Sequence, residues 1–275
     1  MVVRQPLPFR YPGGKYYALE ILRPFWEAIA HDEYREPMVG GGSIFFNKPR
    51  VQFNWLNDLD DELICTYKVL SHSKLRIKLL NMFKDEVATK ERWRSVFELK
   101  PKNELEVAFK YYYLNRTSFS GKLISPAWGY RPKRSLPPDR WHERILPCGK
   151  TLEDVQITCE DFEKVVREKR NGKVTLLYLD PPYFKPPKKK HYRNGFSQAD
   201  HVRLASVLKT SKHKFFLTYD DCEEVRKLYS WANIHEVNFF YRVDNAQVFN
   251  GKRRVGFELV ITNYVVPNSA KGRST

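Results

Sequence analysis

The stretch Thr175-Leu176-Leu177-Tyr178-Leu179-Asp180-Pro181-Pro182-Tyr183 decides the fold of this chain. A short apolar run that stops at turn-forming residues is typical of a buried strand in a parallel sheet. Ligands of open α/β sheets bind beyond the carboxyl ends of the strands, so the residues from Asp180 to Tyr183 are candidates for a functional site. The alternative is purely conformational, because an acid and prolines also suit a turn that ends a strand.

The residues Asp180, Pro181, Pro182 and Tyr183 together indicate a type of chemistry. Each proline fixes its own φ and has no backbone N–H, so the carbonyls beside Asp180 and Pro181 remain free to accept hydrogen bonds from a ligand. The exocyclic amino group of a nucleobase is a poor nucleophile until acceptors hold both of its N–H bonds, and the Tyr183 ring has the shape to stack on a base. We therefore predict that these four residues are catalytic.

The composition favours a nucleic-acid partner and argues against a membrane protein. Lys and Arg total 48 against 32 for Asp and Glu, which gives a net charge of +16. This excess favours a polyanion such as nucleic acid, although a lysine-rich solubilising surface is the alternative. No apolar run approaches the roughly 18 residues of a membrane helix, and no signal peptide is recognisable. The dispersed cysteines and histidines show neither C-x-x-C nor H-x-x-x-H spacing, so we expect reduced intracellular thiols and no metal.

A glycine-rich loop early in the chain is a second candidate site. Helical spacing of apolar residues over 16–29 follows Gly13-Gly14, and a segment ending in Gly40-Gly41-Gly42 precedes a strand-like run over 51–56. We predict a strand, the glycine loop, a helix and then this second strand. Asp58 lies 18 residues after Gly40, near the roughly 20-residue offset of a ribose-binding carboxylate. The loop lacks G-x-G-x-x-G and the Walker pattern, so neither a dinucleotide nor a nucleoside triphosphate is specifically implied, and a simple turn is the alternative.

The second half of the chain continues the alternation of strands and helices. We predict a helix near 199–208, a strand at 214–219, a helix at 222–231, and final strands at 234–242 and 256–264. The last two strands form a predicted hairpin, antiparallel to the rest of a mostly parallel sheet. Between Tyr183 and Gly195 lies a proline- and lysine-rich segment, which we interpret as a lid or, alternatively, as a solvated loop.

Between about Cys65 and Cys159 this alternation is absent. A polar helical stretch is followed by a segment, from Tyr111 to Trp141, that interleaves cations with aromatic rings in a way suited to phosphates and unstacked bases. The alternative is a small helical subdomain with a solvated basic face. We predict three parts: a discontinuous catalytic domain formed by 1–64 and 158–266, an inserted target-recognition domain with a hairpin at 65–157, and a disordered tail at 267–275.

Taken together, these segments resemble the Dam-like DNA adenine-N6 methyltransferases, the D12 class of the alpha group. The matching segments are Phe9-Arg10-Tyr11-Pro12-Gly13-Gly14-Lys15, Glu36-Pro37-Met38-Val39-Gly40-Gly41-Gly42, Asn57-Asp58, Tyr113-Leu114-Asn115-Arg116 through Gly121, Asp161-Phe162, and Asp180 to Tyr183. The resemblance spans nearly the whole chain. It implies an α/β fold with a Rossmann-like methyltransferase sheet and an inserted, mainly helical DNA-recognition domain. It also implies S-adenosyl-L-methionine as the cofactor, S-adenosyl-L-homocysteine as its product, and no metal.

The resemblance also implies roles for individual residues. Cofactor binding is implied for Tyr11, Gly13, Gly14, Lys15, Glu36, Pro37, Met38, Gly40, Gly42, Ser43, Asp58, Asp161, Phe162 and Asp180. DNA binding is predicted for Asn115, Arg116, Ser118, Lys122, Arg131, Lys133, Arg134, Lys188, Lys189 and Lys190. Met38 stands where the family usually has phenylalanine, and Ser120 where it usually has asparagine. Met38 is apolar and adaptable enough to line the methionine end of the cofactor.

The activity implied by the resemblance is methyl transfer to N6 of an adenine flipped out of duplex DNA. We expect a cytoplasmic monomer of prokaryotic or phage type, associated with the nucleoid. It would serve a restriction-modification system with a separately acting endonuclease, or act as an orphan methylase. The alternatives are a methyltransferase acting on RNA, on cytosine N4 or on a protein glutamine, and a basic nucleic-acid-binding module without activity. Asp180 favours adenine, since by family resemblance Ser is commoner with cytosine N4 and Asn with protein glutamine.

Overall fold

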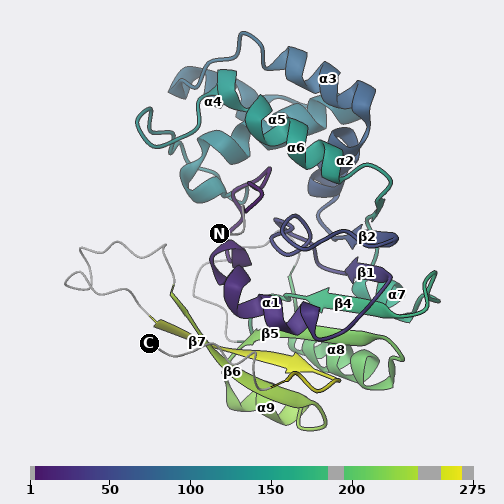
Figure 1. The fold of residues 1–275 in the computed structure, drawn as a ribbon. Coiled ribbons are helices and arrows are strands. Elements are labelled where there is room, and N and C mark those ends of the chain that lie inside the picture. The colour runs from purple at the N-terminus through teal and green to yellow at the C-terminus, as the bar shows by residue number, and fades with distance from the viewer. Residues whose placement is uncertain (1–3, 185–194, 241–254, 268–275) are drawn as a thin grey trace.

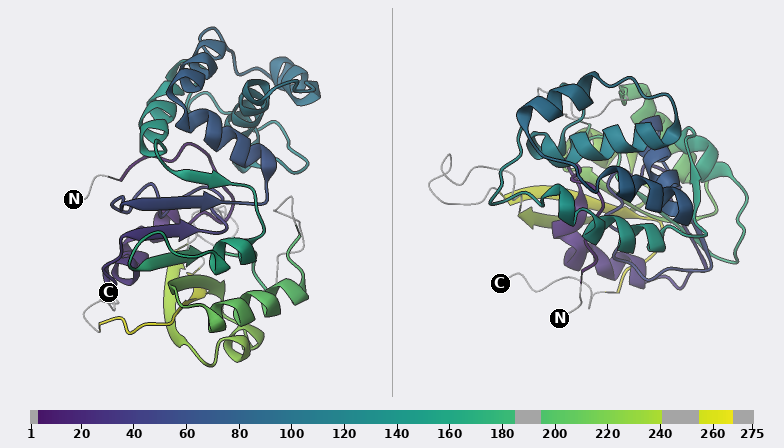
Figure 2. Two further views of the ribbon diagram at one scale, coloured as in Figure 1. Left: turned by 90° about the vertical axis from the view of Figure 1, so that its right-hand side faces the viewer. Right: turned by 90° about the horizontal axis from the view of Figure 1, so that it is seen from above.

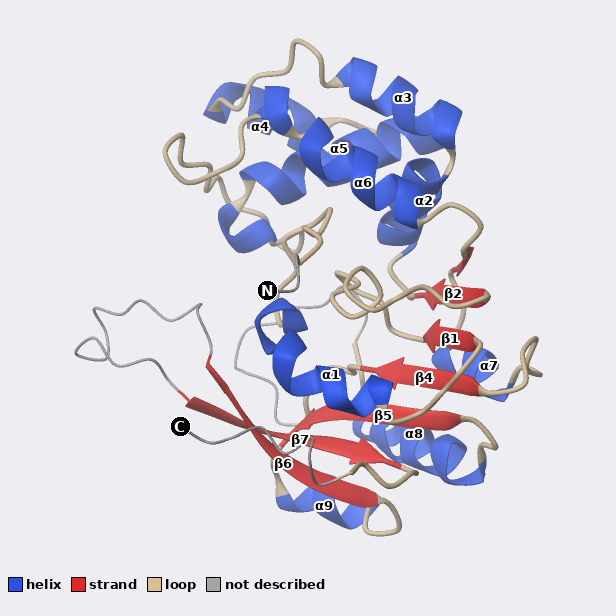
Figure 3. Ribbon diagram, in the orientation of Figure 1, coloured by secondary structure: helices blue, strands red, loops and turns tan. Residues whose placement is uncertain are grey.

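The structure is a computed structural model that describes residues 4–184, 195–240 and 255–267. Its framework is a seven-stranded sheet in the order β3-β2-β1-β4-β5-β7-β6 (Figure 1 and Figure 3). The strands are β1 (Glu33–Glu36), β2 (Phe53–Asn57), β3 (Gln156–Thr158), β4 (Thr175–Leu179), β5 (Lys214–Asp220), β6 (Asn233–Phe240) and β7 (Val255–Thr262). Pairing is parallel from β3 to β5, whereas β7 runs antiparallel to both β5 and β6. The predicted mostly parallel sheet with a terminal antiparallel hairpin is therefore confirmed.

Helices cover both faces of the sheet, with α1 on one face and α7, α8 and α9 on the other (Figure 2). On these faces the helices are η1 (Lys15–Ala18), α1 (Leu19–Glu27), α7 (Phe162–Arg167), α8 (Gln198–Thr210) and α9 (Glu223–Leu228). Alternate residues of each central strand supply the two cores, because successive side chains of a strand point to opposite faces. In β4, Leu176 and Tyr178 pack on the α1 side, while Leu177 and Leu179 pack under α7 and α8.

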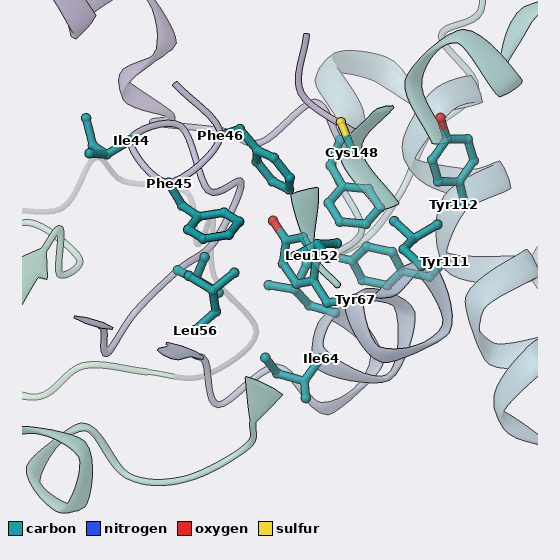
Figure 4. Packing of buried hydrophobic residues seen from close by; sticks show 14 of the residues in the cluster. Ile44, Phe45, Phe46, Leu56, Ile64, Tyr67, Tyr111, Tyr112, Cys148 and Leu152 are labelled. Atoms are coloured by element: carbon teal, nitrogen blue, oxygen red, sulfur yellow. The ribbon is translucent and has the colours of Figure 1, made fainter. Parts of the chain in front are cut away.

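A group of helices lies beyond the β2–β3 edge of the sheet (Figure 1). It comprises α2 (Asp61–Ser71), α3 (Ser73–Met82), α4 (Lys90–Glu98), α5 (Glu104–Thr117), η2 (Phe119–Gly121), η3 (Pro138–Arg140) and α6 (His142–Thr151). Figure 4 shows Phe45 and Leu56 on one side of Tyr67, and Tyr111 on the other, within one cluster. Burial of each such side chain contributes roughly 1.5–3 kcal/mol. The helical group therefore shares its core with the sheet, and its division into a separate domain at 65–157 remains a prediction.

The segment after the glycine loop differs from the prediction. Residues 43–47 form consecutive turns rather than a helix. Ile44, Phe45 and Phe46 are all almost completely buried, and three successive side chains cannot share one face of a helix. The backbone nitrogen of Phe45 instead donates to the carboxylate of Glu36 at 2.8 Å.

One predicted helix is shorter in the structure, and three further predictions meet the limits of the described residues. The helix expected at 222–231 ends at Leu228, and the strand expected at 234–242 is described to Phe240. The predicted lid between Tyr183 and Gly195, which contains Lys188, Lys189 and Lys190, lies outside the described residues except at its ends. The predicted tail at 267–275 lies outside them too, except for its first residue.

Candidate active site

A pocket opens at the carboxyl ends of β1, β2 and β4, where the strand order changes direction between β1 and β4. This is the place at which open α/β sheets bind their ligands. The space within the pocket is about 900 Å³, the part open to solvent included. The predicted cofactor residues that line it are Tyr11, Gly13, Gly14, Lys15, Pro37, Met38, Gly40, Gly42, Ser43, Asp58, Phe162 and Asp180.

The glycine loop and Asp58 form one wall of the pocket. Gly40 has a φ of 46°, and a Cβ at this position would lie 2.7 Å from a ring carbon of Tyr11, so only glycine fits. The Asp58 carboxylate accepts hydrogen bonds from the backbone nitrogens of Gly40 at 2.9 Å and Asp60 at 3.0 Å. Burial raises the pKa of Asp58 to about 6. The carboxylate at the end of β2 is thus fixed against the loop and faces the pocket.

Asp180 follows β4 directly and is held by side chains from two other elements. The Nζ atom of Lys15 lies 2.7 and 3.0 Å from its two carboxylate oxygens, and Thr218 of β5 donates to Oδ1 at 2.7 Å. Lys15 is buried, which alone would lower its pKa, but Asp180 and Glu258 raise that pKa well above its usual value. Lys15 therefore stays protonated beside a carboxylate that lines the pocket.

Tyr183, the predicted base-stacking residue, is held through its hydroxyl. The hydroxyl donates to Oε1 of Glu258 on β7 and accepts from Nζ of Lys15 at 3.2 Å. The same Nζ lies 5.2 Å from the centroid of the Tyr183 ring and 3.7 Å from Oε2 of Glu258. Of the four predicted catalytic residues, Asp180 and Pro182 line the pocket, and Pro181 and Tyr183 are outside its lining.

Glu36 lies beneath the glycine loop and outside the pocket lining. Its buried carboxylate accepts hydrogen bonds from the Tyr34 hydroxyl at 2.6 Å and from the Phe45 nitrogen at 2.8 Å. Burial raises the pKa of Glu36 to about 8. Direct cofactor contact by Glu36 stays a prediction, and this geometry favours a supporting position instead.

Asp161 is likewise engaged within the protein. It caps the start of α7 through the Glu163 nitrogen, and its two oxygens accept from Arg203 of α8 at 2.7 and 2.9 Å. The guanidinium of Arg203 lies 4.2 Å from the centroid of the Phe162 ring, and Phe162 lines the pocket. Phe162 therefore faces the pocket while Arg203 joins it to Asp161.

Phe184 and Phe196 are two aromatic residues near the pocket that contact α8, and the first of them is also hydrogen-bonded to β5. The His201 ring lies between Phe184 and Phe196, with centroids 4.8 and 4.7 Å away, and its Nδ1 is hydrogen-bonded to the Tyr219 hydroxyl. The Asp220 carboxylate accepts from the Phe184 nitrogen at 2.9 Å. Phe196 lines the pocket beside Phe162, so the sheet holds this wall as well as the end of the Asp180–Tyr183 loop.

The predicted DNA-contacting segment is joined to the pocket through Arg10. Asn115 accepts from the Arg10 nitrogen at 2.9 Å and donates to its carbonyl at 2.8 Å, one residue before the pocket residue Tyr11. The Arg10 guanidinium also donates to the Ser118 carbonyl at 2.9 Å. Ser118 and Trp128 form an isolated antiparallel bridge in this segment, and the hairpin of the inserted domain stays a prediction.

The predicted DNA-binding residues fall into two groups. Asn115, Arg116 and Ser118 are buried, and the amide of Asn115 and the hydroxyl of Ser118 bond within the protein. DNA contact by these three side chains stays a prediction that their burial does not favour. Lys122 is half-buried, whereas Arg131, Lys133 and Arg134 are exposed.

Sequence reasoning did not single out Glu258, Thr218 or Asp220. Thr218 and Glu258 lie inside runs predicted only as strands, and Asp220 directly follows one; the faces and ends of a strand cannot be assigned to a site before the topology is known. The available signal was Glu258, an acid among apolar residues, since such a charge is rarely buried unless it is paired.

The sheet order and the pocket at its switch point are consistent with a class I methyltransferase fold. The model of the D12 class N6 adenine-specific DNA methyltransferases matches residues 11–243. The chain therefore belongs to this family and is an adenine-specific DNA methyltransferase.

Several relatives of the chain are named adenine or Type II methyltransferases. It is similar to the Type II methyltransferase M.CviBI of Paramecium bursaria Chlorella virus NC1A, with 26% identity over 94% of this chain and 98% of the relative. The Type II methyltransferase M.MjaIII of Methanocaldococcus jannaschii is 28% identical over 94% and 99%. The DNA adenine methylase of Salmonella typhi is 23% identical over 83% and 85%.

Neither a membrane span nor a metal cluster is found within residues 4–184, 195–240 and 255–267. No helix there is both long and apolar enough to cross a bilayer. No three His, Cys, Asp or Glu side chains in the same ranges are grouped so as to hold a metal ion.

Proposed function

We propose that the pocket binds S-adenosyl-L-methionine and that Asp180 and Pro181 present to it the amino group of an adenine flipped out of duplex DNA. The observation that carries this proposal is the Asp180 carboxylate, which lines the pocket while Lys15 and Thr218 fix its orientation. An ionised acceptor at the edge of a cofactor pocket is what an unreactive exocyclic amine requires.

The pocket residues suit the parts of this cofactor. Asp58 offers carboxylate oxygens for ribose hydroxyls, and the Phe162 ring offers a flat apolar surface for an adenine. Gly40 lets the backbone pass where a side chain would collide with Tyr11, which exposes the loop to a ligand. When bound, S-adenosyl-L-methionine supplies a methyl group activated by its sulfonium.

The catalytic contribution of the chain is orientation and electrostatics. The Asp180 carboxylate and the Pro181 carbonyl accept the two amino hydrogens of the target adenine and direct the nitrogen lone pair toward the pocket. Lys15, whose pKa its two carboxylate neighbours raise well above the usual value against the opposing effect of burial, holds the Asp180 carboxylate in place. Asp180 is also the acceptor nearest to the proton that N6 must lose.

Extrusion of the adenine costs a few kcal/mol of pairing and stacking. Stacking on Tyr183 and phosphate contacts from Lys122, Arg131, Lys133 and Arg134 offset this cost. Phe119, which is 54% exposed beside the Ser118–Trp128 bridge, adds an aromatic surface to the same segment. Because Arg10 joins this segment to the pocket, duplex contact and base capture occur side by side.

The biological setting is part of the same proposal. We expect a cytoplasmic monomer that modifies a specific site in duplex DNA. It acts in a restriction-modification system with a separate endonuclease, or as an orphan methylase.

The test is transfer of labelled methyl from S-adenosyl-L-methionine to unmethylated genomic DNA, with RNA in parallel and the products identified as nucleosides. We expect label in N6-methyladenine of DNA. Asp180→Asn, which introduces a donor where acceptors are needed, should lower turnover by at least about 100-fold with cofactor binding retained.

The matched control is Asp85→Asn, because Asp85 is exposed in the helical group and should keep full activity. Label confined to RNA would favour the RNA methyltransferase alternative. Full turnover by the Asp180→Asn variant would refute the role of Asp180.

A further inference from the structure

Glu258 is a buried acid in the middle of the apolar strand β7. The three residues after it, Leu259, Val260 and Ile261, are fully buried, whereas Phe257 before it is exposed, and Glu258 itself is 2% exposed. It pairs in register with Asp220 of β5, at the carboxyl end of that strand. Burial of a carboxylate is costly unless other groups compensate for it, so its partners indicate what it does.

Among the described residues, Glu258 contacts two residues of the candidate active site. Glu258 Oε1 accepts the hydroxyl proton of Tyr183, and Oε2 lies 3.7 Å from Nζ of Lys15. Lys15 in turn bonds Asp180 at 2.7 Å. Glu258 itself is outside the pocket lining, so it reaches the site through Tyr183 and Lys15.

We infer that Glu258 is a positioning residue for methyl transfer, which orients Tyr183 and shares the charge of Lys15 with Asp180. This inference rests on the roles proposed above for Asp180 and Tyr183. It adds Glu258 of β7 to the residues that act in methyl transfer.

The first part of the argument concerns the Tyr183 hydroxyl. The Lys15 ammonium has only donors, so the Tyr183 hydroxyl must donate its own hydrogen bond to another acceptor. Bonded to Glu258, it leaves the Asp180 oxygens available for the amino group of the substrate. The same bond fixes the ring in the orientation from which it stacks on a base.

The second part concerns charge. The buried Lys15 lies within ion-pair distance of both carboxylates, so Asp180 shares its positive charge with Glu258. Without Glu258, Lys15 and Asp180 would form a neutral pair, and Asp180 would accept hydrogen bonds from the amino group less strongly. A residue with only a structural role in the sheet would change stability and leave turnover per folded molecule intact.

The test compares Glu258→Gln, Tyr183→Phe and the double variant in steady-state methyl transfer, with cofactor affinity and thermal stability measured alongside. We expect Glu258→Gln to lower kcat by at least about 10-fold, with the Kd for S-adenosyl-L-methionine changed less than about threefold. We expect the double variant to be no slower than the slower single variant, since Glu258→Gln removes the charge that strengthens this hydrogen bond and Tyr183→Phe removes its donor.

Three results would overturn the inference: full kcat for Glu258→Gln, full kcat for Tyr183→Phe, or losses that multiply in the double variant. Tyr183→Phe tests the same bond if Glu258→Gln fails to fold. The matched control is Glu236→Gln on the adjacent strand β6, whose exposed side chain pairs with Arg226 and should leave kcat unchanged. If the wild type itself does not methylate adenine, the proposed function fails; if only Glu258→Gln is unimpaired, the inference alone fails.

Discussion

The Asp58 carboxylate accepts a hydrogen bond from the Gly40 nitrogen at 2.9 Å, although 18 residues separate them in the chain. The contact holds an acid with a pKa raised by burial to about 6 at the wall of the pocket. If the ionised form binds the ribose hydroxyls, the apparent Kd for S-adenosyl-L-methionine should rise about tenfold per pH unit below a pH of about 6. The apparent Kd should be constant above a pH of about 7.

Calorimetric titration of cofactor at several pH values, with folding checked by circular dichroism, measures this dependence. Asp58→Asn should bind weakly and lose the dependence. An affinity that is constant from about pH 5 to 8 in the wild type would remove Asp58 from the binding site.

Glu36 makes the stability of the protein depend on pH. Its pKa is about 8 in the folded state against an ordinary value of 4.5, so the folded state binds this proton more tightly than the unfolded chain. Its contribution to stability is fully present below about pH 4.5 and is lost as pH rises to about 8. The loss amounts to at most about 1.4 kcal/mol per pH unit.

Glu36→Gln cannot ionise, so its free energy of unfolding should fall less than that of the wild type between about pH 6 and pH 9. Urea unfolding at these two pH values checks the difference. The exposed acid Glu98 provides the control, since Glu98→Gln should follow the wild type. Parallel curves for the wild type and Glu36→Gln would contradict the prediction.

Arg203 joins Asp161 to the ring of Phe162, and we expect it to act on cofactor binding. Arg203→Met removes both contacts and should raise KM for S-adenosyl-L-methionine about fivefold, with kcat within about twofold. Arg167→Met is the matched control. Arg167 pairs with Glu163, as Arg203 does, but it is an exposed residue of α7. If the two substitutions changed KM equally, the effect on cofactor binding would come from general surface charge and not from the Phe162 contact.

The exposed cations after the Ser118–Trp128 bridge should account for part of the salt dependence of DNA binding. Replacement of Arg131, Lys133 and Arg134 by Ala should weaken binding and reduce the slope of log K against log salt by about 0.9 for each phosphate that the variant no longer neutralises. The control replaces three exposed lysines of the helical group by Ala and so removes the same charge: Lys74, Lys78 and Lys84. An unchanged slope in the first variant would place the phosphate contacts elsewhere.

The sequence was sufficient to predict the strands whose apolar runs end at turn-forming residues, and the loops that follow them. The run ending at Asp180 and the offset of Asp58 from Gly40 led to the correct edge of the sheet because parallel strands bring their carboxyl ends together. The turns at 43–47 were missed because three successive apolar residues fit a buried helix, a strand or a turn equally well in sequence.

The contacts behind the pocket required the three-dimensional structure. Lys15, Asp180, Thr218 and Glu258 are far apart in the chain and meet only through the order of β4, β5 and β7. The burial of Asn115 likewise depends on Arg10, more than a hundred residues earlier. A motif match names such residues, but only their partners show whether they face a ligand or the protein interior.

The position of β7 has a consequence for the newly made protein. Within the described chain, β6 is hydrogen-bonded to β7 alone, yet β6 leaves the ribosome first. Until β7 enters between β5 and β6, the nascent chain carries a glycine loop and Asp180 but no Glu258 beside Lys15 and Tyr183. A domain generally folds as a unit, so the entry of β7 completes both the described sheet and the charge cluster in one step. Methylating capacity would then be absent from chains in which β7 has yet to emerge from the ribosome.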